Sequence, residues 1–158
     1  MKVRILVSKW MPAFVWMILI FLGSSDALSA EHTSRFIVPF LRWLDPGISP
    51  MAIASIHMTI RKLGHFTEYA VLAALLWRGL RGTFPAGARG VLALIAFFVA
   101  AGFAASDEFH QSFVPTRTAS ARDVMIDCVG ALVAVSLCAI LTWRRNGAVR
   151  VPAQQATG

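Results

Sequence analysis

Four apolar runs alternate with polar stretches along the chain, and each run is long enough to form a helix. They cover about residues 10–28, 63–80, 90–106 and 124–143. An α-helix that crosses a bilayer needs about 20 predominantly apolar residues. The pattern therefore predicts an all-α membrane fold, a bundle of four transmembrane helices, within a single domain at residues 1–145.

The first run has a second interpretation as a signal peptide. Lys2, Arg4 and Lys9 precede it, and Ser25-Asp26-Ala27 resembles a small-residue cleavage site. The run is long for the apolar core of a signal peptide and about long enough to span a bilayer, which favours a retained helix. The topology of the remaining chain is the same under both interpretations.

A shorter helix is expected between the first two runs. Apolar residues recur at helical spacing from Phe36 to Leu44, whereas Arg35 and Arg42 lie off that face. Such an amphipathic segment is typical of a short helix in the membrane interface, and Pro39 is expected to bend it.

Two further helix starts can be read from capping residues. Ser49 and Pro50 resemble an N-cap followed by a first-turn proline, so a helix is expected from about Pro50 to Leu80. Ser120 with Asp123 resembles a capping box that opens the last helix. The helix expected from about Pro50 carries a polar stripe along one side. Its residues are separated by four, four and three positions: His57, Arg61, His65 and Glu68.

Composition agrees with a membrane protein. Of the 158 residues, 57% are hydrophobic and 15% are charged, whereas soluble domains are about 25% charged. The net charge of +7 comes with no basic helix or groove motif, so a nucleic-acid partner is not expected. Cys128 and Cys138 lie too far apart on one helix to form a disulfide and are interpreted as small packing residues.

The distribution of charge predicts the orientation. Nine of the 15 Lys and Arg residues fall near the N-terminus, the second connector and the C-terminus, and six fall on the opposite side. The positive-inside rule then places both termini in the cytoplasm of a bacterial inner membrane, with residues 146–158 as a disordered cytoplasmic tail. All eight acidic residues fall at or beyond the outer ends of the spans.

This topology places the polar residues at the outer ends of four helices at the same depth in the membrane. They are Ser24, Ser25 and Asp26; Lys62, His65 and Glu68; Asp107, Glu108, His110 and Gln111; and Asp123 and Asp127. An ionised carboxylate facing lipid about one turn inside a span costs several kilocalories. We therefore expect these side chains to line a polar cavity that opens to the outer leaflet.

Two sequence blocks resemble the VanZ-like membrane family. The first is residues 62–69, K-L-G-H-F-T-E-Y, and the second is residues 106–117, S-D-E-F-H-Q-S-F-V-P-T-R, followed by Asp123. Residues 21–25, F-L-G-S-S, are similar to the serine pair that ends the family's first helix. The resemblance marks these motif positions: Lys62, His65, Glu68, Tyr69, Ser106, Asp107, Glu108, Gln111, Pro115, Arg117 and Asp123.

The resemblance implies a small multi-helix membrane protein. The family's namesake is associated with low-level resistance to the glycopeptide teicoplanin, but membership specifies neither substrate nor reaction. The sequence departs from the family at Thr116, where glycine is common, and at Asp127, where asparagine is expected.

Three hypotheses for the polar residues follow. In the first, they form an interhelical network of ion pairs that locks the bundle, in a non-catalytic protein that modulates the envelope or a partner. In the second, they bind or modify an anionic lipid-linked envelope component, and binding without chemistry is as plausible as hydrolysis or transfer. The ligand-binding candidates of this second hypothesis are Lys62, Tyr69, Ser106, Glu108, Gln111, Arg117, Arg122, Asp123 and Asp127.

Lys62, Arg117 and Arg122 suit a phosphate in the second hypothesis. The catalytic candidates are His65, Glu68 and Asp107, in which a histidine and a carboxylate act as acid and base. The third hypothesis is a divalent metal site, which rests only on weak spacing and lacks a two-histidine motif. No cofactor is specified, and self-association of such a small bundle is plausible without a recognisable interface motif.

Overall fold

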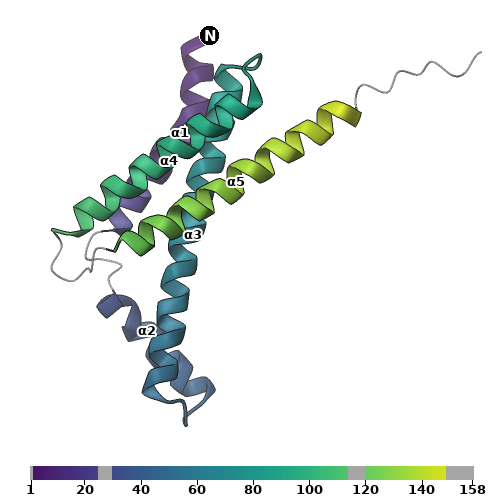
Figure 1. Ribbon diagram of the computed structural model, residues 1–158. Coiled ribbons are helices and arrows are strands. Elements are labelled where there is room, and N and C mark those ends of the chain that lie inside the picture. The colour runs from purple at the N-terminus through teal and green to yellow at the C-terminus, as the bar shows by residue number, and fades with distance from the viewer. Residues whose placement is uncertain (1, 25–29, 114–119, 149–158) are drawn as a thin grey trace, which may run out of the picture.

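The computed structural model describes residues 2–24, 30–113 and 120–148, which fold into helices and short connections (Figure 1). The helices are α1 (Lys2–Gly23), α2 (Ala30–Leu44), α3 (Pro50–Thr83), α4 (Arg89–Gln111) and α5 (Ala121–Ala148). No strand occurs in these described ranges. The prediction of an all-α fold is confirmed.

Several helix ends differ from the expected ones, since α1 ends at Gly23 rather than at residue 28 and α3 ends at Thr83 rather than at Leu80. α1 begins at Lys2, before the apolar run, and α4 continues past residue 106 to Gln111. α5 extends to Ala148, so the beginning of the expected tail is helical, and residues 149–158 lie outside the described part of the chain.

The expected start of α3 is confirmed by its cap. The Ser49 hydroxyl accepts a hydrogen bond from the backbone N–H of Ala52 at 3.1 Å, and Pro50 opens the first turn. The preceding turn is closed by Asp45, whose carboxylate accepts from the N–H of Gly47 at 2.9 Å. These local contacts set where the longest helix of the molecule begins.

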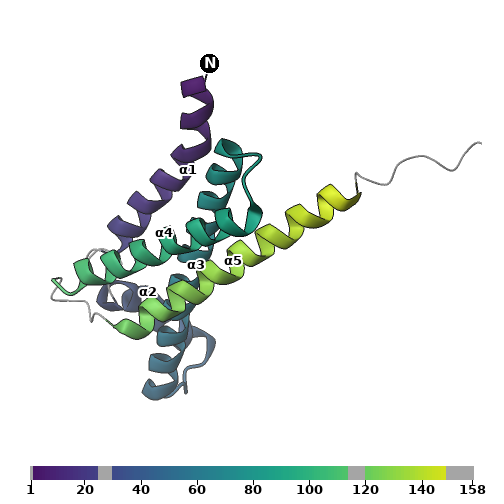
Figure 2. The same cartoon turned by 45° about the horizontal axis from the view of Figure 1, so that its top comes forward.

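α3 is the central helix, and each of the other four helices packs against it. Figures 1 and 2 show α4 and α5 crossing it obliquely in its upper half, while α2 lies along its lower end. The core between them contains many alanines, which let helices approach closely without a hydrophobic drive. It includes Tyr69, Leu72, Ala73, Leu76, Trp77, Ala96, Ala100, Ala104, Ala131 and Val135.

Tryptophans and a lysine tie α1 to α3. The Trp10 ring packs on Gly79, and its Nε1 donates to the Thr83 hydroxyl at 2.9 Å. Lys9 donates to the backbone carbonyl of Gly82. Further along α1, Trp16 Nε1 donates to the Glu68 carbonyl at 2.8 Å. α1 therefore runs beside the second half of α3 and brings its own end to the level of His65.

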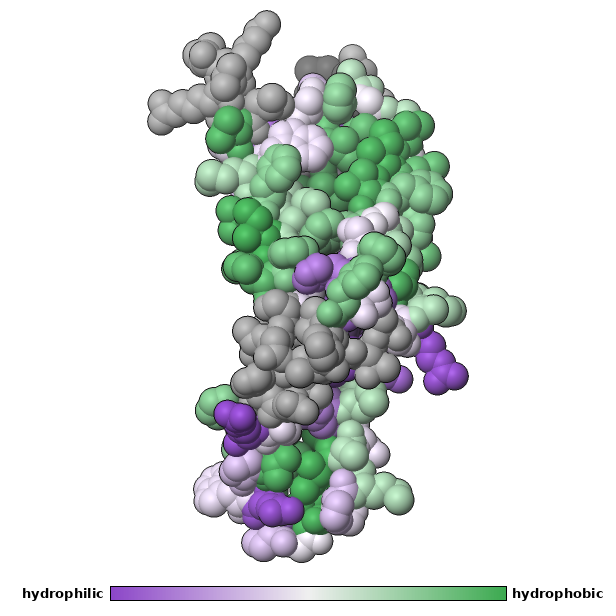
Figure 3. Space-filling model, turned by 90° about the vertical axis from the view of Figure 1, so that its left-hand side faces the viewer, coloured by the Kyte–Doolittle hydropathy of each residue, from purple (hydrophilic) through white to green (hydrophobic). Residues whose placement is uncertain are grey.

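Two helices are long and apolar enough to cross a membrane, at Arg89–Gln111 and Ala121–Trp143, and Val7–Gly23 is a shorter apolar helix. Large apolar side chains are exposed on the outside of all three, among them Phe14, Ile18, Leu94, Phe98, Leu132 and Leu137. Figure 3 shows this apolar surface over the upper half of the molecule, with hydrophilic patches near and below its middle. Two of the four predicted spans are thus consistent with the helices observed.

α2 is the short helix predicted between the first two runs. Its apolar side chains Phe36, Phe40 and Trp43 are exposed, and it contacts the beginning of α3. Its place in the membrane interface stays a prediction.

Candidate functional site

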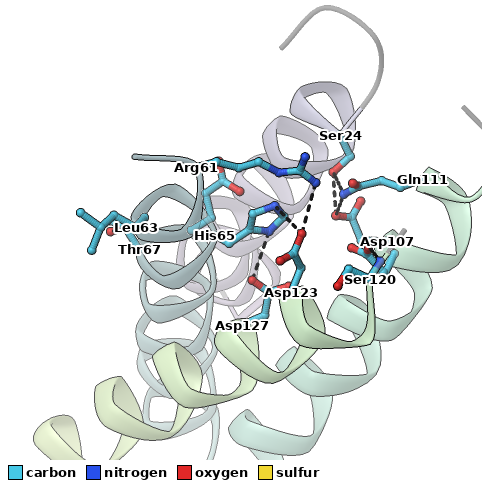
Figure 4. Close-up of polar contacts among 12 residues, drawn as sticks. Ser24, Arg61, Leu63, His65, Thr67, Asp107, Gln111, Ser120, Asp123 and Asp127 are labelled. Atoms are coloured by element: carbon cyan, nitrogen blue, oxygen red, sulfur yellow. Dashed lines mark hydrogen bonds and ion pairs between the residues drawn. The ribbon is translucent and has the colours of Figure 1, made fainter. Parts of the chain in front are cut away.

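Polar side chains from four helices meet where α1 and α4 end and α5 begins (Figure 4). Seven of them are buried, and Arg61 joins them through an ion pair. We call this group the polar cluster: Ser24, Arg61, His65, Asp107, Glu108, Gln111, Asp123 and Asp127. The convergence predicted from the topology of the helix ends is present in the structure.

One part of the polar cluster links α1 to α4. The Ser24 hydroxyl donates to Asp107 Oδ2 at 2.6 Å, and Gln111 Nε2 donates to the same oxygen at 3.1 Å. Gln111 Nε2 also lies 3.3 Å from the Ser24 hydroxyl oxygen. Asp107 and Gln111 are one helical turn apart, so both reach the end of α1 from the same face of α4.

The other part links α3 to α5. Arg61 donates to Asp123 Oδ2 at 3.2 Å. The His65 imidazole lies between two carboxylates, with Nδ1 3.3 Å from Asp127 Oδ1 and Nε2 4.0 Å from Asp123 Oδ2. The Nδ1 contact has an ion-pair distance but not the angles of a hydrogen bond. Because Asp123 and Asp127 are four residues apart, one turn of α5 presents both to His65.

The predicted capping box at the start of α5 is only half formed. The Ser120 hydroxyl accepts from the N–H of Arg122 at 3.2 Å, which caps the helix. Asp123 does not return to the Ser120 N–H, because its carboxylate is paired with Arg61. Glu108 of α4 accepts from the Ser120 N–H instead. A carboxylate from a neighbouring helix thus completes the cap and joins α4 to α5.

Tyr69 and Glu68 lie one turn deeper along α3. The Tyr69 side chain is fully buried, and its ring centroid lies 6.3 Å from that of Phe103. Its hydroxyl has no hydrogen-bond partner among the described residues. Glu68 is half-buried, and its backbone carbonyl accepts from Trp16.

Three predicted ligand residues point away from the polar cluster. Lys62, Ser106 and Arg122 are exposed, and the Ser106 hydroxyl donates to the Phe103 carbonyl of its own helix at 2.8 Å. Arg117, which is predicted with Lys62 and Arg122 to bind phosphate, lies outside the described residues, as do Ser25, Asp26 and Pro115. Lys62 is exposed although it lies three residues before the buried His65, and its role as a ligand residue stays a prediction.

Arg61 belongs to the polar cluster but is not among the ligand-binding residues expected from the sequence. The sequence places it in the polar stripe, one turn before His65, whereas the expected ligand residue is the neighbouring Lys62. The four-residue spacing to His65 was the signal that identifies it. Ser24 was noted only for its position at a helix end, and its contact with Asp107 depends on packing between helices distant in sequence.

The structure gives the metal hypothesis no support within the part of the chain that it describes. No group of three or more His, Cys, Asp or Glu side chains is placed there to hold an ion. His110 instead stacks on Phe21, with ring centroids 4.4 Å apart.

A family model described as VanZ/LLP1 matches residues 9–142, a range that contains every residue of the polar cluster. The chain belongs to the VanZ/LLP1 family. The resemblance found in the two sequence blocks is therefore confirmed. No curated protein and no solved structure matches the chain significantly.

Membership in the VanZ/LLP1 family links the protein to glycopeptide resistance at the level of the family. Together with the two long apolar helices, it indicates a membrane protein. The chemistry that this VanZ/LLP1 protein performs has to be argued from its polar cluster.

Proposed function

We propose that the protein is a multi-pass protein of the bacterial inner membrane whose polar cluster recognises an anionic lipid-linked component of the cell envelope, with or without modifying it. Recognition of this kind alters the access of glycopeptides such as teicoplanin to the cell surface. The proposal extends the family's link to glycopeptide resistance to a specific site on this chain.

One observation carries the proposal. Seven polar side chains are buried at one end of an otherwise apolar bundle, yet several of their atoms have no hydrogen-bond partner among the described residues. A network built only for stability gains by satisfying every buried polar group, because an unsatisfied one costs about 1–3 kcal/mol. Unused hydrogen-bonding capacity in a buried cluster is what a ligand site provides.

The dimensions of α3 support a position for the polar cluster at the outer membrane surface. From His65 to Thr83 the helix rises about 27 Å at about 1.5 Å per residue, close to the thickness of a bilayer's hydrocarbon core. Lys9, Trp10 and Thr83 lie together at the opposite end. Basic and tryptophan side chains are typical of a membrane boundary. We therefore propose that α1 and α3 are also spans, with both termini cytoplasmic.

Reporter fusions test this topology. A periplasm-dependent phosphatase fused after Trp143 is expected to be inactive, because that end of α5 is proposed to be cytoplasmic. The same reporter inserted at Gly47, in the turn between α2 and α3, is expected to be active. Immunoblots of both fusions control for expression. The opposite pattern of activity would place the polar cluster at the inner surface and overturn the proposed site.

A conservative substitution tests the function of the site. Asp107→Asn keeps the shape of the side chain and an acceptor for Ser24 and Gln111, but it removes the charge. We expect the teicoplanin tolerance that expression of the protein confers to fall to the level of an empty vector, while the protein stays monodisperse in detergent. Ser106→Ala, at an exposed position one residue away, is the matched control and is expected to retain tolerance.

The alternative function is a structural network, and the interhelical contacts favour it. Ser24 with Asp107 links α1 to α4, and Arg61 with Asp123 links α3 to α5. If Asp107→Asn prevents folding, the charge is needed for the bundle and the alternative is supported. If the variant folds and confers full tolerance, recognition through this carboxylate is refuted.

A further inference from the structure

The polar cluster contains more carboxyl groups than cations. Four carboxyl side chains are buried in it: Asp107, Glu108, Asp123 and Asp127. Among the described residues, the cationic groups that face them are the Arg61 guanidinium and the His65 imidazole, and Arg61 is already paired with Asp123 at 3.2 Å. A phosphate placed among these carboxyl groups would meet like charge in a region of low dielectric constant, which is unfavourable. The buried part of the site therefore favours a cation or a donor of hydrogen bonds.

Oxygen atoms of the polar cluster that accept no hydrogen bond also favour a cation or a donor as the ligand group. Asp107 Oδ1 and Gln111 Oε1 have no hydrogen-bond partner among the described residues, and Asp127 Oδ1 has the ion-pair contact with His65 Nδ1 at 3.3 Å but no hydrogen bond there. The Asp107, Gln111 and Asp127 side chains are 4%, 0% and 2% exposed, so bulk water does not reach them. An amide oxygen accepts hydrogen bonds and cannot donate them, and the same holds for an ionised carboxylate. These three oxygen atoms can only accept, although Arg61 Nε and His65 Nδ1 are also without a hydrogen-bond partner in the described part of the polar cluster.

The Tyr69 hydroxyl adds a fourth oxygen to these three acceptors. The side chain is 0% exposed, and the hydroxyl has no partner among the described residues. Tyr69 lies one turn after His65 on α3, and His65 faces Asp127 of α5. The Tyr69 ring packs near Phe103, one turn before Asp107 on α4. These side chains of α3, α4 and α5 thus offer four oxygens that can accept hydrogen bonds, and the Tyr69 hydroxyl is the one of the four that can also donate.

Cations lie at the same level but on the outside. Lys62 directly follows Arg61, Arg122 directly precedes Asp123, and both side chains are exposed. An exposed cation at the headgroup level attracts phosphate without the cost of burying its charge. The site therefore has a basic outer edge and an acceptor-rich interior, two environments of opposite preference.

We infer, on the basis of the proposed function, that the anionic group recognised is a phosphate at the outer edge of the site, in a lipid whose headgroup also carries a primary ammonium. Lys62 and Arg122 hold the phosphate at the surface. The ammonium enters the polar cluster and donates to these oxygens of Tyr69, Asp107, Gln111 and Asp127. Phosphatidylethanolamine has this combination, with three N–H donors on its headgroup nitrogen.

A lipid series with identical acyl chains tests the inference on the full-length protein in detergent. Phosphatidylethanolamine and phosphatidylcholine both carry a phosphate and a positive charge, and they differ in the N–H donors. Phosphatidylglycerol carries the phosphate without the ammonium. With dissociation constants measured by native mass spectrometry, we expect phosphatidylethanolamine to bind about tenfold more tightly than either, as the loss of charge-assisted hydrogen bonds implies.

Substitutions test whether the polar cluster causes the preference for phosphatidylethanolamine. Tyr69→Phe removes only a hydroxyl that has no partner in the described structure, so every described hydrogen bond stays intact. We expect it to reduce the preference for phosphatidylethanolamine over phosphatidylcholine several-fold without lowering the melting temperature. Arg122→Ala is expected to weaken all three lipids equally, and Arg78→Ala, an exposed cation at the opposite end of the bundle, is the control.

The outcomes separate this inference from the proposed function. Equal binding of all three lipids, weakened by Arg122→Ala, would overturn the ammonium inference and leave recognition of a phosphate standing. Equal binding of all three lipids that Arg122→Ala leaves unchanged would overturn both. A Tyr69→Phe protein that keeps the whole preference would also overturn the inference, because the hydroxyl then contacts no ligand.

Discussion

Gly130→Ala is expected to separate α3 from α5 and to destabilise the protein by about 3 kcal/mol, at the upper end of the usual cost of overpacking. A Cβ atom at Gly130 would meet the backbone of Phe66, with its carbonyl oxygen nearest and its carbonyl carbon and Cα at 3.1 and 3.2 Å. These are backbone atoms in the middle of a helix, so the collision cannot be relieved by turning a side chain. Either the two helices move apart or the substitution is not tolerated.

The expected loss is measured as the shift in thermal unfolding of the purified protein, followed by circular dichroism in detergent. Gly102→Ala is the control, because a Cβ there meets nothing within 4 Å. Alanine is the better helix former, so this control is expected to melt at the same temperature or slightly higher. A Gly130→Ala protein that melts like the wild type would show that α3 and α5 do not approach this closely.

The close approach at Gly130 also positions the site. Asp127 lies three residues before Gly130 on α5, and His65 directly precedes Phe66 on α3. Close contact between the backbones of α3 and α5 at Phe66 and Gly130 therefore also brings the His65 imidazole near the Asp127 carboxylate. Gly130→Ala is expected to disturb the His65–Asp127 pair as well as the packing.

The sequence predicts how far along each helix the site lies, but it does not predict how each helix is rotated about its own axis. Helix ends follow from caps and apolar runs, and the Ser49 cap of α3 is where the sequence indicates. Rotation is harder, because neighbouring residues on a helix point about 100° apart, and an apolar side chain suits lipid as well as the core. The choice between Arg61 and Lys62 as the inward cation depends on that rotation, which packing at Gly130 sets.

The hydrogen-bond and ion-pair partners of the acidic residues also could not be predicted from the sequence. Ser120 and Asp123 have the spacing of a capping box, and local rules pair them. In the structure Arg61 takes the Asp123 carboxylate and Glu108 takes the Ser120 N–H. Both competing residues come from other helices, so only the assembled bundle decides between the local and the distant partner.

His65→Leu is expected to destabilise the protein by about 3 kcal/mol, because it leaves a buried carboxylate without its partner. Asp127 is 2% exposed and faces the imidazole at 3.3 Å, and Asp123 lies one turn away on the same face. Lys62→Leu is the control on the same helix. Its side chain is exposed, so we expect its effect to stay within about 0.5 kcal/mol.

The double variant His65→Leu with Asp127→Leu decides what the pair contributes. We expect it to recover most of the lost stability in thermal unfolding, since apolar side chains often replace a buried ion pair without cost. If the double variant remains as unstable as His65→Leu alone, the pair itself holds α3 to α5, and the structural alternative is favoured. If stability returns while teicoplanin tolerance does not, leucines suffice for the fold, and the imidazole and carboxylate are required by the ligand.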